Sequence, residues 1–97
     1  MAQILYSEGA LDDLERLFRF LAEHDPHIAG DSAAAIRSAV EMLASHPLAG
    51  RRVEGELREL VISYGKTGYV ALYRFFPATE QIRILSLRHQ RELDFPG

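Results

Sequence analysis

A histidine and three arginines could form a phosphate-binding site in this chain. Ile84–Leu87 reads as a buried strand, and Arg88, His89 and Arg91 follow it directly. A guanidinium group can stabilise negative charge that develops on a phosphate, and a histidine with a pKa near neutrality can move a proton. Together with Arg58, these are the residue types that an RNA-cleaving site needs. The competing interpretation, which residue types alone favour, is a solvated sheet face that turns the arginines toward water.

Other kinds of site find little support in the sequence. His24, Asp25 and His27 are close together, but they straddle a helix break at Pro26, where clustered polar residues usually form a solvated loop. The chain has no cysteine, so it can form neither a disulfide nor a zinc–thiolate site. None of the serines has the context of a nucleophile elbow. We therefore expect no metal, no cofactor and no catalytic triad.

Length and charge limit the possible classes of protein. The 97 residues fit one compact domain spanning residues 1–97. A net charge of −3 argues against a broad, nonspecific grip on nucleic acid, and we expect no direct sequence-specific nucleic-acid binding either. Residues 1–46 carry eight acidic and three basic side chains, whereas residues 47–97 carry six and eight. The sequence thus predicts an acidic N-terminal half and a mildly basic C-terminal half.

The sequence predicts a soluble, cytoplasmic protein. Its first residues lack both the positive region and the long apolar region of a secretory signal, and no stretch approaches the length of a membrane span. The absence of cysteine suits a reducing compartment. We expect no membrane partner.

Two consecutive helices are predicted after a short N-terminal strand. Ser7 is a good N-cap, and apolar residues recur at spacings of three and four over Gly9–His24. Asp25 and Pro26 end this helix and open a second one, because proline is tolerated at the first helical position and aspartate suits the cap before it. The second helix stops by Pro47. Two helices joined by so few residues form an antiparallel hairpin.

The second half of the chain predicts an antiparallel sheet. Residues 47–56 carry turn residues and mixed charge without a period, so we interpret them as a connecting loop. Three strands follow as a meander, over Leu57–Ser63, Tyr69–Phe76 and Gln81–Leu87. With the helical hairpin on one face and the first strand at or beside the meander, the fold class is α+β, in two layers.

Two details of the strands bear on function. The continuous apolar run Leu60–Ile62 suggests burial on both faces or a central position. Arg74 and Arg83 are expected on neighbouring strands. The helices carry more apolar residues than a small sheet can cover, so part of their surface is expected to receive an amphipathic helix of a partner.

The order of these patterns resembles the RelE/ParE superfamily of bacterial type II toxins. The resemblance covers nearly the whole chain and rests on several short segments: residues 10–14, 36–43 with Pro47 and Gly50, 57–60, Tyr73-Arg74, and 84–87 leading into 89–92. It implies a cytoplasmic toxin that is held inactive by an antitoxin encoded beside it. The disordered segment of such an antitoxin folds across the toxin surface, which gives a hetero-oligomer.

Within this superfamily, the chain is more similar to ParE than to RelE. RelE-like members cut mRNA on the ribosome with lysines and arginines on the central strands and a tyrosine near the C-terminus. This chain has Gly68-Tyr69-Val70 where an arginine would follow Gly-Tyr, offers only Arg58 on the preceding strand, and has no tyrosine after Arg91. The resemblance therefore implies a ParE-like toxin that inhibits DNA gyrase by protein–protein contact, without catalytic residues of its own.

We assign two surfaces on this basis. The expected effector surface comprises Arg58, Arg88, His89, Arg91 and Phe95. The expected surface for a ParD-like antitoxin comprises Leu14, Phe18, Leu21, Ile36 and Val40. The alternative is a RelE-like, ribosome-dependent mRNA endonuclease in which Arg58, Arg88, His89 and Arg91 do the work, and a third possibility is a scaffold that binds its antitoxin without being toxic.

Overall fold

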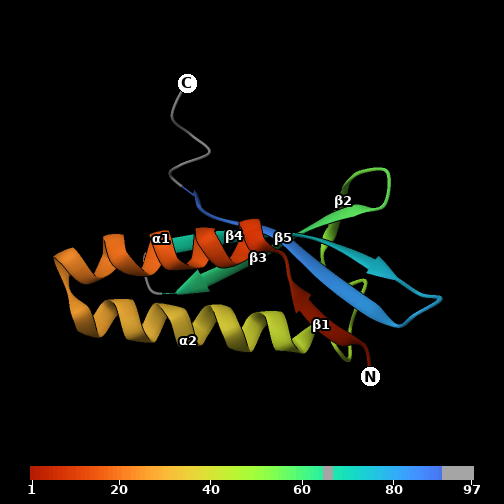
Figure 1. The fold of residues 1–97 in the computed structure, drawn as a ribbon, viewed down its shortest axis with the longest axis horizontal. Coiled ribbons are helices and arrows are strands. Elements are labelled where there is room, and N and C mark those ends of the chain that lie inside the picture. Colours follow the sequence, from red (N-terminus) through yellow and green to blue (C-terminus); the bar gives the residue numbers. More distant parts are fainter. Residues whose placement is uncertain (65–66, 91–97) are drawn as a thin grey trace.

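The helices and strands form two layers, with α1 and α2 side by side over one face of a sheet (Figure 1). This computed structural model describes residues 1–64 and 67–90, apart from the side chains of Tyr64 and Thr67. No helix in this part of the chain is long and apolar enough to cross a membrane. The α+β prediction is confirmed. In chain order the elements are β1 (Gln3–Tyr6), α1 (Glu8–His24), α2 (Pro26–Met42), β2 (Arg51–Glu54), β3 (Leu57–Tyr64), β4 (Thr67–Phe76) and β5 (Gln81–His89).

The helical hairpin begins and turns where its capping residues predict. The Ser7 hydroxyl accepts a hydrogen bond from the Ala10 N–H at 3.0 Å, which satisfies one of the free donors in the first turn of α1. Asp25 closes α1 through its own N–H, and its carboxylate accepts from the His27 N–H at 3.0 Å to open α2. Pro26 occupies the first position of α2. One residue therefore ends one helix and starts the next, which keeps the connection tight.

The sheet differs from the prediction at both edges. Its strand order is β1-β5-β4-β3-β2, and β1 pairs with β5 in parallel, so the sheet is mixed rather than wholly antiparallel. Between the two strands of this parallel pair, the chain forms the helical hairpin and the antiparallel strands β2, β3 and β4. At the other edge Arg51–Glu54 forms β2 within the segment that we expected to be a loop. All four of its residues are exposed, so apolar alternation could not reveal it.

Of the two alternatives predicted for Leu60–Ile62, the central position is confirmed, since β3 lies between β4 and β2, whereas burial on both faces is wrong. Leu60 and Ile62 are 9% and 3% exposed, whereas Val61 between them is 58% exposed. The helices cover only one face, so alternate residues along β3 point toward the core and toward solvent. The sheet therefore has a covered face and an open outer face.

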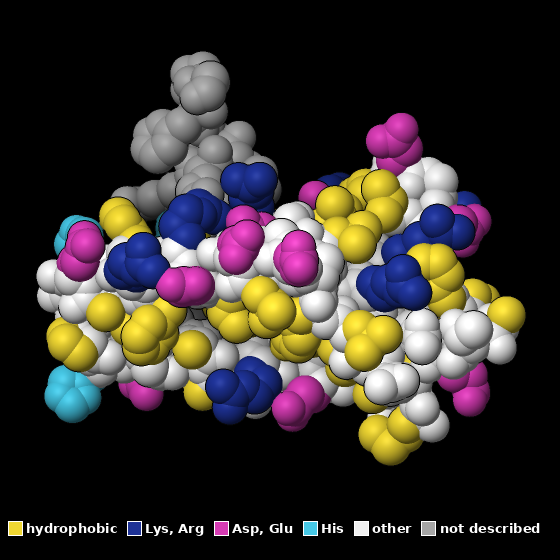
Figure 2. Space-filling view, viewed as in Figure 1, with side chains coloured by type: hydrophobic (Ala, Val, Ile, Leu, Met, Phe, Trp, Pro, Cys, Tyr) yellow, Lys and Arg dark blue, Asp and Glu magenta, His cyan; other side chains and the backbone are white. Residues whose placement is uncertain are grey.

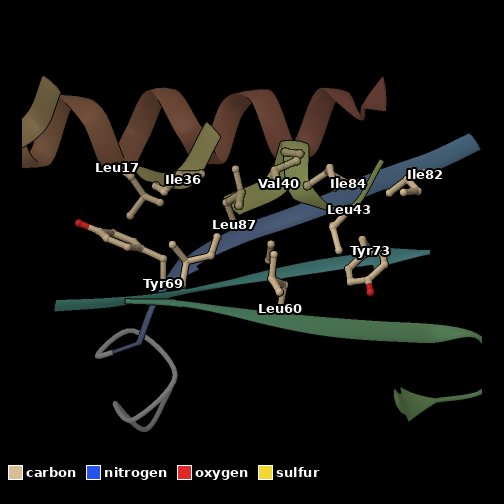
Figure 3. Close-up of a cluster of buried hydrophobic side chains, with 13 residues drawn as sticks. Leu17, Ile36, Val40, Leu43, Leu60, Tyr69, Tyr73, Ile82, Ile84 and Leu87 are labelled. Carbon is tan, nitrogen blue, oxygen red and sulfur yellow. The ribbon is translucent and has the colours of Figure 1, made fainter. Parts of the chain in front are cut away.

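The core lies between the covered face and the helices (Figure 3). Leu17 and Ile36 reach from the helices toward Tyr69 and its neighbours on the strands. Polar bonds also join α1 to β5: the Asp13 carboxylate accepts from the Leu87 N–H at 3.0 Å, and the Ser7 hydroxyl donates to the Leu85 carbonyl at 3.2 Å. The fully buried larger side chains are Tyr69, Tyr73, Leu43, Ile82, Ile84, Leu87 and Val40.

Candidate interaction surfaces

Arg58 fastens the connection between α2 and β2. Its guanidinium donates to the Gly50 carbonyl at 2.8 Å and to the Leu48 carbonyl at 3.4 Å. Next to it, the buried Tyr73 hydroxyl accepts from the Gly50 N–H at 2.8 Å and donates to the Pro47 carbonyl at 2.9 Å. These four bonds hold residues 47–50 against β3 and β4. Arg58 thus has a structural use that its sequence context did not indicate.

The burial of Tyr73 affects both its pKa and the residue that can lie beside its ring. Burial raises the pKa of the Tyr73 phenol above its usual value of 10.0, while the bond from the Gly50 N–H and the charge of Arg58 act in the opposite direction. A side chain at Gly50 would not fit, since its Cβ would lie 2.5 Å from a ring carbon of Tyr73 and 2.7 Å from the Glu59 carbonyl oxygen. The glycine lets the loop approach the ring.

Arg88 and His89 lie at the other end of the sheet and on opposite faces. Arg88 is paired with Val70, on the open outer face, and is exposed. His89 is paired with the buried Tyr69, and the two rings meet edge to face with centroids 5.3 Å apart. Successive residues of a strand point to opposite sides, so the two side chains cannot face a common ligand from β5 without a change in the strand.

The three described effector residues, Arg58, Arg88 and His89, therefore do not form one pocket. Arg58 lies in the row of Tyr73, whereas Arg88 lies in the row of Val61, three residues along β3 and two strands across. Standard strand spacings place the two backbone positions about 14 Å apart. Arg91 and Phe95 lie outside the described residues, so their part in this surface stays a prediction.

A groove runs between the helices and the edge strand β1. Its volume is about 290 Å³, and β1, α1 and α2 all contribute to it. Figure 2 shows hydrophobic side chains gathered along the helical layer, between rows of charged ones. Among the described strands, β1 pairs with β5 alone and is therefore an edge strand of the sheet. The lining residues are Ile4, Tyr6, Leu11, Leu14, Ala33, Ile36, Arg37 and Glu41.

The residues of the predicted antitoxin surface differ in their exposure to solvent. Phe18 is 47% exposed, and Leu14 and Leu21 are half-buried, so these three positions are open to a partner. Ile36 and Val40 are 2% and 0% exposed, and both belong to the core cluster. Ile36 still lines the groove, and the assignment of both positions to the antitoxin surface stays a prediction. Apolar spacing identifies the buried stripe of α2, but it does not show that this stripe packs on the chain's own sheet.

Charged and polar groups mark one side of the groove. Burial raises the pKa of Tyr6 above 10.0, the nearby Glu41 carboxylate raises it further, and Arg37 opposes both. The Tyr6 phenol is therefore protonated at neutral pH. It offers a partner a hydrogen-bond donor beside an arginine and a glutamate.

The His24, Asp25 and His27 cluster serves the helical turn. Asp25 caps α2, and the His24 ring nitrogen lies 3.0 Å from the Phe20 carbonyl while its ring packs against Phe20 at 4.9 Å. Among residues 1–64 and 67–90, no group of three potential metal ligands occurs. The hairpin thus uses the side chains of His24 and Asp25 itself.

The expectation that Arg74 and Arg83 lie on neighbouring strands is confirmed, and two further features of the exposed surface were not predicted. Leu11 lines the groove and is 52% exposed, but it was not assigned to the antitoxin surface. On the outer face of the sheet, Arg74 and Arg83 both lie over the ring of Phe76. The spacing of Arg74 and Phe76, two residues apart on one strand, could have indicated a shared face.

Comparisons with known proteins place this fold in one class of toxins. A chain of the chromosomal ParDE toxin–antitoxin system of P. aeruginosa superposes with a TM-score of 0.72 at 22% identity, over 92% of this chain and 96% of that one. A chain of the RelBE2 toxin–antitoxin complex of Mycobacterium tuberculosis gives a TM-score of 0.61 at 26% identity, over 92% and 98%. The fold is that of RelE/ParE toxins.

Sequence comparison shows the family. The model of the ParE toxin of the type II toxin–antitoxin system parDE matches residues 4–94. Toxin RelE3 of Caulobacter vibrioides is 39% identical over 92 residues, which are 95% of this chain and 98% of that protein. The chain belongs to the ParE toxin family, within the ParE/RelE class of type II toxins. The resemblance seen in the sequence is confirmed.

Proposed function

We propose that this toxin is ParE-like in its action: it inhibits DNA gyrase in the cytoplasm by protein–protein contact and is neutralised by a cognate antitoxin. The observation that carries the proposal is the separation of Arg58, Arg88 and His89. Catalysis of RNA cleavage needs its proton-transfer group and its phosphate-binding cations around one reacting phosphate. Here Arg58 is bonded to backbone carbonyls, and Arg88 and His89 lie on opposite faces of β5.

The charge distribution supports the same proposal. The chain is acidic overall, and its N-terminal half carries eight acidic against three basic side chains. A protein that must approach ribosomal RNA gains from a broad cationic surface, which raises both its affinity and its rate of encounter. A protein target makes no such demand.

Two assays with the purified chain test this proposal. We expect it to inhibit supercoiling by purified gyrase and to leave mRNA intact in a ribosome-dependent cleavage assay. Arg88→Ala should weaken the gyrase effect, whereas Arg19→Ala, which removes an exposed partner of Glu15 on α1, should not. Cut message with undisturbed supercoiling would instead favour the endonuclease, an alternative that gains weight from the name of the relative RelE3.

For the antitoxin, we propose the groove between α1, α2 and β1 as the docking site. Its lining is mainly apolar, and Phe18, Leu14 and Leu21 extend the apolar surface along α1. An amphipathic segment of a partner can bury such a surface. The similar chains of known structure come from toxin–antitoxin systems, which supports an antitoxin as the occupant.

A matched pair of substitutions on α1 tests the docking site. Leu11 and Phe20 are 52% and 56% exposed, but they lie nine residues apart and hence on opposite sides of the helix. We expect Leu11→Glu to weaken binding of the antitoxin encoded beside the toxin by about 100-fold, because it places a charge in the groove. Phe20→Glu should leave affinity nearly unchanged. Equal losses, or no loss for Leu11→Glu, would exclude the groove.

Growth measurements separate a toxin from an inert scaffold. Expression of the chain alone in bacteria should arrest growth, and expression with its antitoxin should restore it. Unimpaired growth with the protein present would favour the scaffold that only binds its antitoxin.

A further inference from the structure

Arg74 and Arg83 are held side by side on the open outer face of the sheet. They are direct cross-strand partners on β4 and β5, and both are exposed. Their guanidinium carbons lie 4.6 and 5.0 Å from the centroid of the Phe76 ring, so one aromatic side chain positions both groups. Opposed like charges on neighbouring strands destabilise a sheet. The two cation–π contacts with the Phe76 ring act against this cost.

The described chain supplies no counter-ion for this pair. Within residues 1–64 and 67–90, neither Arg74 nor Arg83 makes an ion pair or a hydrogen bond to a carboxylate. The acidic residue of the neighbouring row on the outer face, Glu59, is bonded to Arg51 at 2.8 Å. Arg74 and Arg83 thus form a pair of cations to which an anionic group of a partner could bind.

The surroundings of the pair are apolar. Arg74 and Arg83 share a row with Leu57 of β3 and Leu5 of β1, and Leu72 follows in the next row. These side chains are half-buried, and no described helix covers them, because both helices lie on the other face. A ligand for this surface therefore combines negative charge with apolar groups.

We propose that Arg74, Arg83 and Phe76 form a docking site for an acidic segment of a partner protein. Carboxylates of the segment pair with the two guanidinium groups, and its apolar residues lie on the row of leucines. Carboxylates match the planar donors of arginine. The inference does not depend on gyrase or on the groove between the helices, because the outer face is a separate surface.

Nucleic acid fits this surface less well. Single-stranded nucleic acid binds through aromatic rings on which its bases stack, and through many phosphate contacts. Two guanidinium groups already lie over the ring of Phe76, and the chain carries a net charge of −3. Short-range pairing with a few carboxylates needs neither a free ring nor an extended cationic surface.

A peptide titration tests the site. The probe is a capped peptide that alternates glutamate and leucine, added to the ¹⁵N-labelled full chain while the arginine Nε–H signals are followed by NMR. We expect the Arg74 and Arg83 signals to shift, with binding that weakens as salt is raised. The double substitution Arg74→Gln and Arg83→Gln should lower the affinity about tenfold. Arg19→Gln on α1 is the control and should not change it.

Several outcomes would overturn the inference. A peptide with glutamine in place of glutamate should not bind, and equal binding of the two peptides would show that charge is not recognised. No shift of Arg74 and Arg83 with the glutamate peptide would also exclude the site. A thymidine oligonucleotide that binds more tightly than the peptide, and loses binding in the double variant, would replace the acidic segment by nucleic acid. Thermal unfolding of each variant confirms that the fold is kept.

Discussion

β4 carries a buried tyrosine toward each of its ends, and the hydroxyl groups of the two tyrosines differ in their hydrogen bonding. Tyr73 and Tyr69 are both 0% exposed. The Tyr73 hydroxyl is bonded to the Gly50 N–H and the Pro47 carbonyl, whereas the Tyr69 hydroxyl has no hydrogen-bond partner among the described residues. Near Tyr73 the polar groups fix a loop. Near Tyr69 the described residues hold the ring by packing.

This difference assigns different tasks to the predicted effector residues. Arg58 lies at the Tyr73 end, where its bonds to the Gly50 and Leu48 carbonyls help to hold residues 47–50 against the sheet. Arg88 and His89 stand at the Tyr69 end, in the rows of Val70 and Tyr69. We therefore expect substitutions at the Tyr73 end to act mainly on stability, and those at the Tyr69 end to act mainly on the target.

The largest effect is expected at Gly50. Gly50→Ala forces a Cβ against the Tyr73 ring and the Glu59 carbonyl, and should lower the free energy of unfolding by about 3 kcal/mol. Gly30→Ala in α2 is the matched control, because nothing lies within 4 Å of its Cβ. It should raise stability by up to ~1 kcal/mol through helix propensity. Urea unfolding measures both, and a mild effect at Gly50 would show that the loop can move away.

A pair of tyrosine substitutions probes the two ends directly. Tyr73→Phe leaves the Gly50 N–H and the Pro47 carbonyl without their partner and should cost about 2 kcal/mol. Tyr69→Phe removes a hydroxyl without a described partner and should change stability by less than about 0.5 kcal/mol, or increase it. Equal losses in chemical denaturation would mean that both hydroxyls are bonded in solution.

Two arginine substitutions extend the comparison to function. Arg58→Met should lower the free energy of unfolding by about 1 kcal/mol, because the bonds to the Gly50 and Leu48 carbonyls are lost. Arg88→Met should cost less stability but weaken gyrase inhibition more. The readouts are urea unfolding and the supercoiling assay. The supercoiling assay is run under conditions in which both variants are folded. If the Arg58→Met variant kept its stability but no longer inhibited gyrase, Arg58 would belong to the effector surface.

The smallest effect is a dependence on alkaline pH. The pKa of Tyr73 is raised in the folded state, so its contribution is fully present below pH 10.0 and is lost as the pH rises through the folded pKa. Tyr6, whose pKa is also raised, titrates in the same window. The stability difference between the wild type and Tyr73→Phe should therefore be constant below about pH 9 and shrink as the pH rises above 10.0. A constant difference would contradict the raised pKa.

Much of the fold could be predicted because its signals are local. Ser7 and Asp25 mark helix ends through bonds that each makes within three residues, and the spacing of apolar residues marks the helices and the three long strands. Strand β2 was not predicted, because all its residues are exposed and the strand is defined by its pairing with β3. The parallel pairing of β1 with β5 joins residues about 80 positions apart, which no local pattern encodes.

The candidate surfaces were predicted less well, for the same reason. Phe18 is exposed and Leu14 and Leu21 are half-buried, whereas Ile36 and Val40 with the same spacing are buried. A periodic stripe shows that a helix buries one side, yet it does not say whether the chain itself or a partner covers that side. The pairing of Arg74 with Arg83 over Phe76 likewise depends on strand register.

The sequence by itself determined which segments form helices and strands, the uneven charge of the two halves, and the family to which the chain belongs. The tertiary structure decided which apolar stripes are covered, which face of the sheet stays open, and where each arginine lies. Propensity, capping and periodicity act over a few residues, so the order of residues contains them directly. Coverage and register depend on contacts between distant segments, and these exist only once the helices have packed on the sheet.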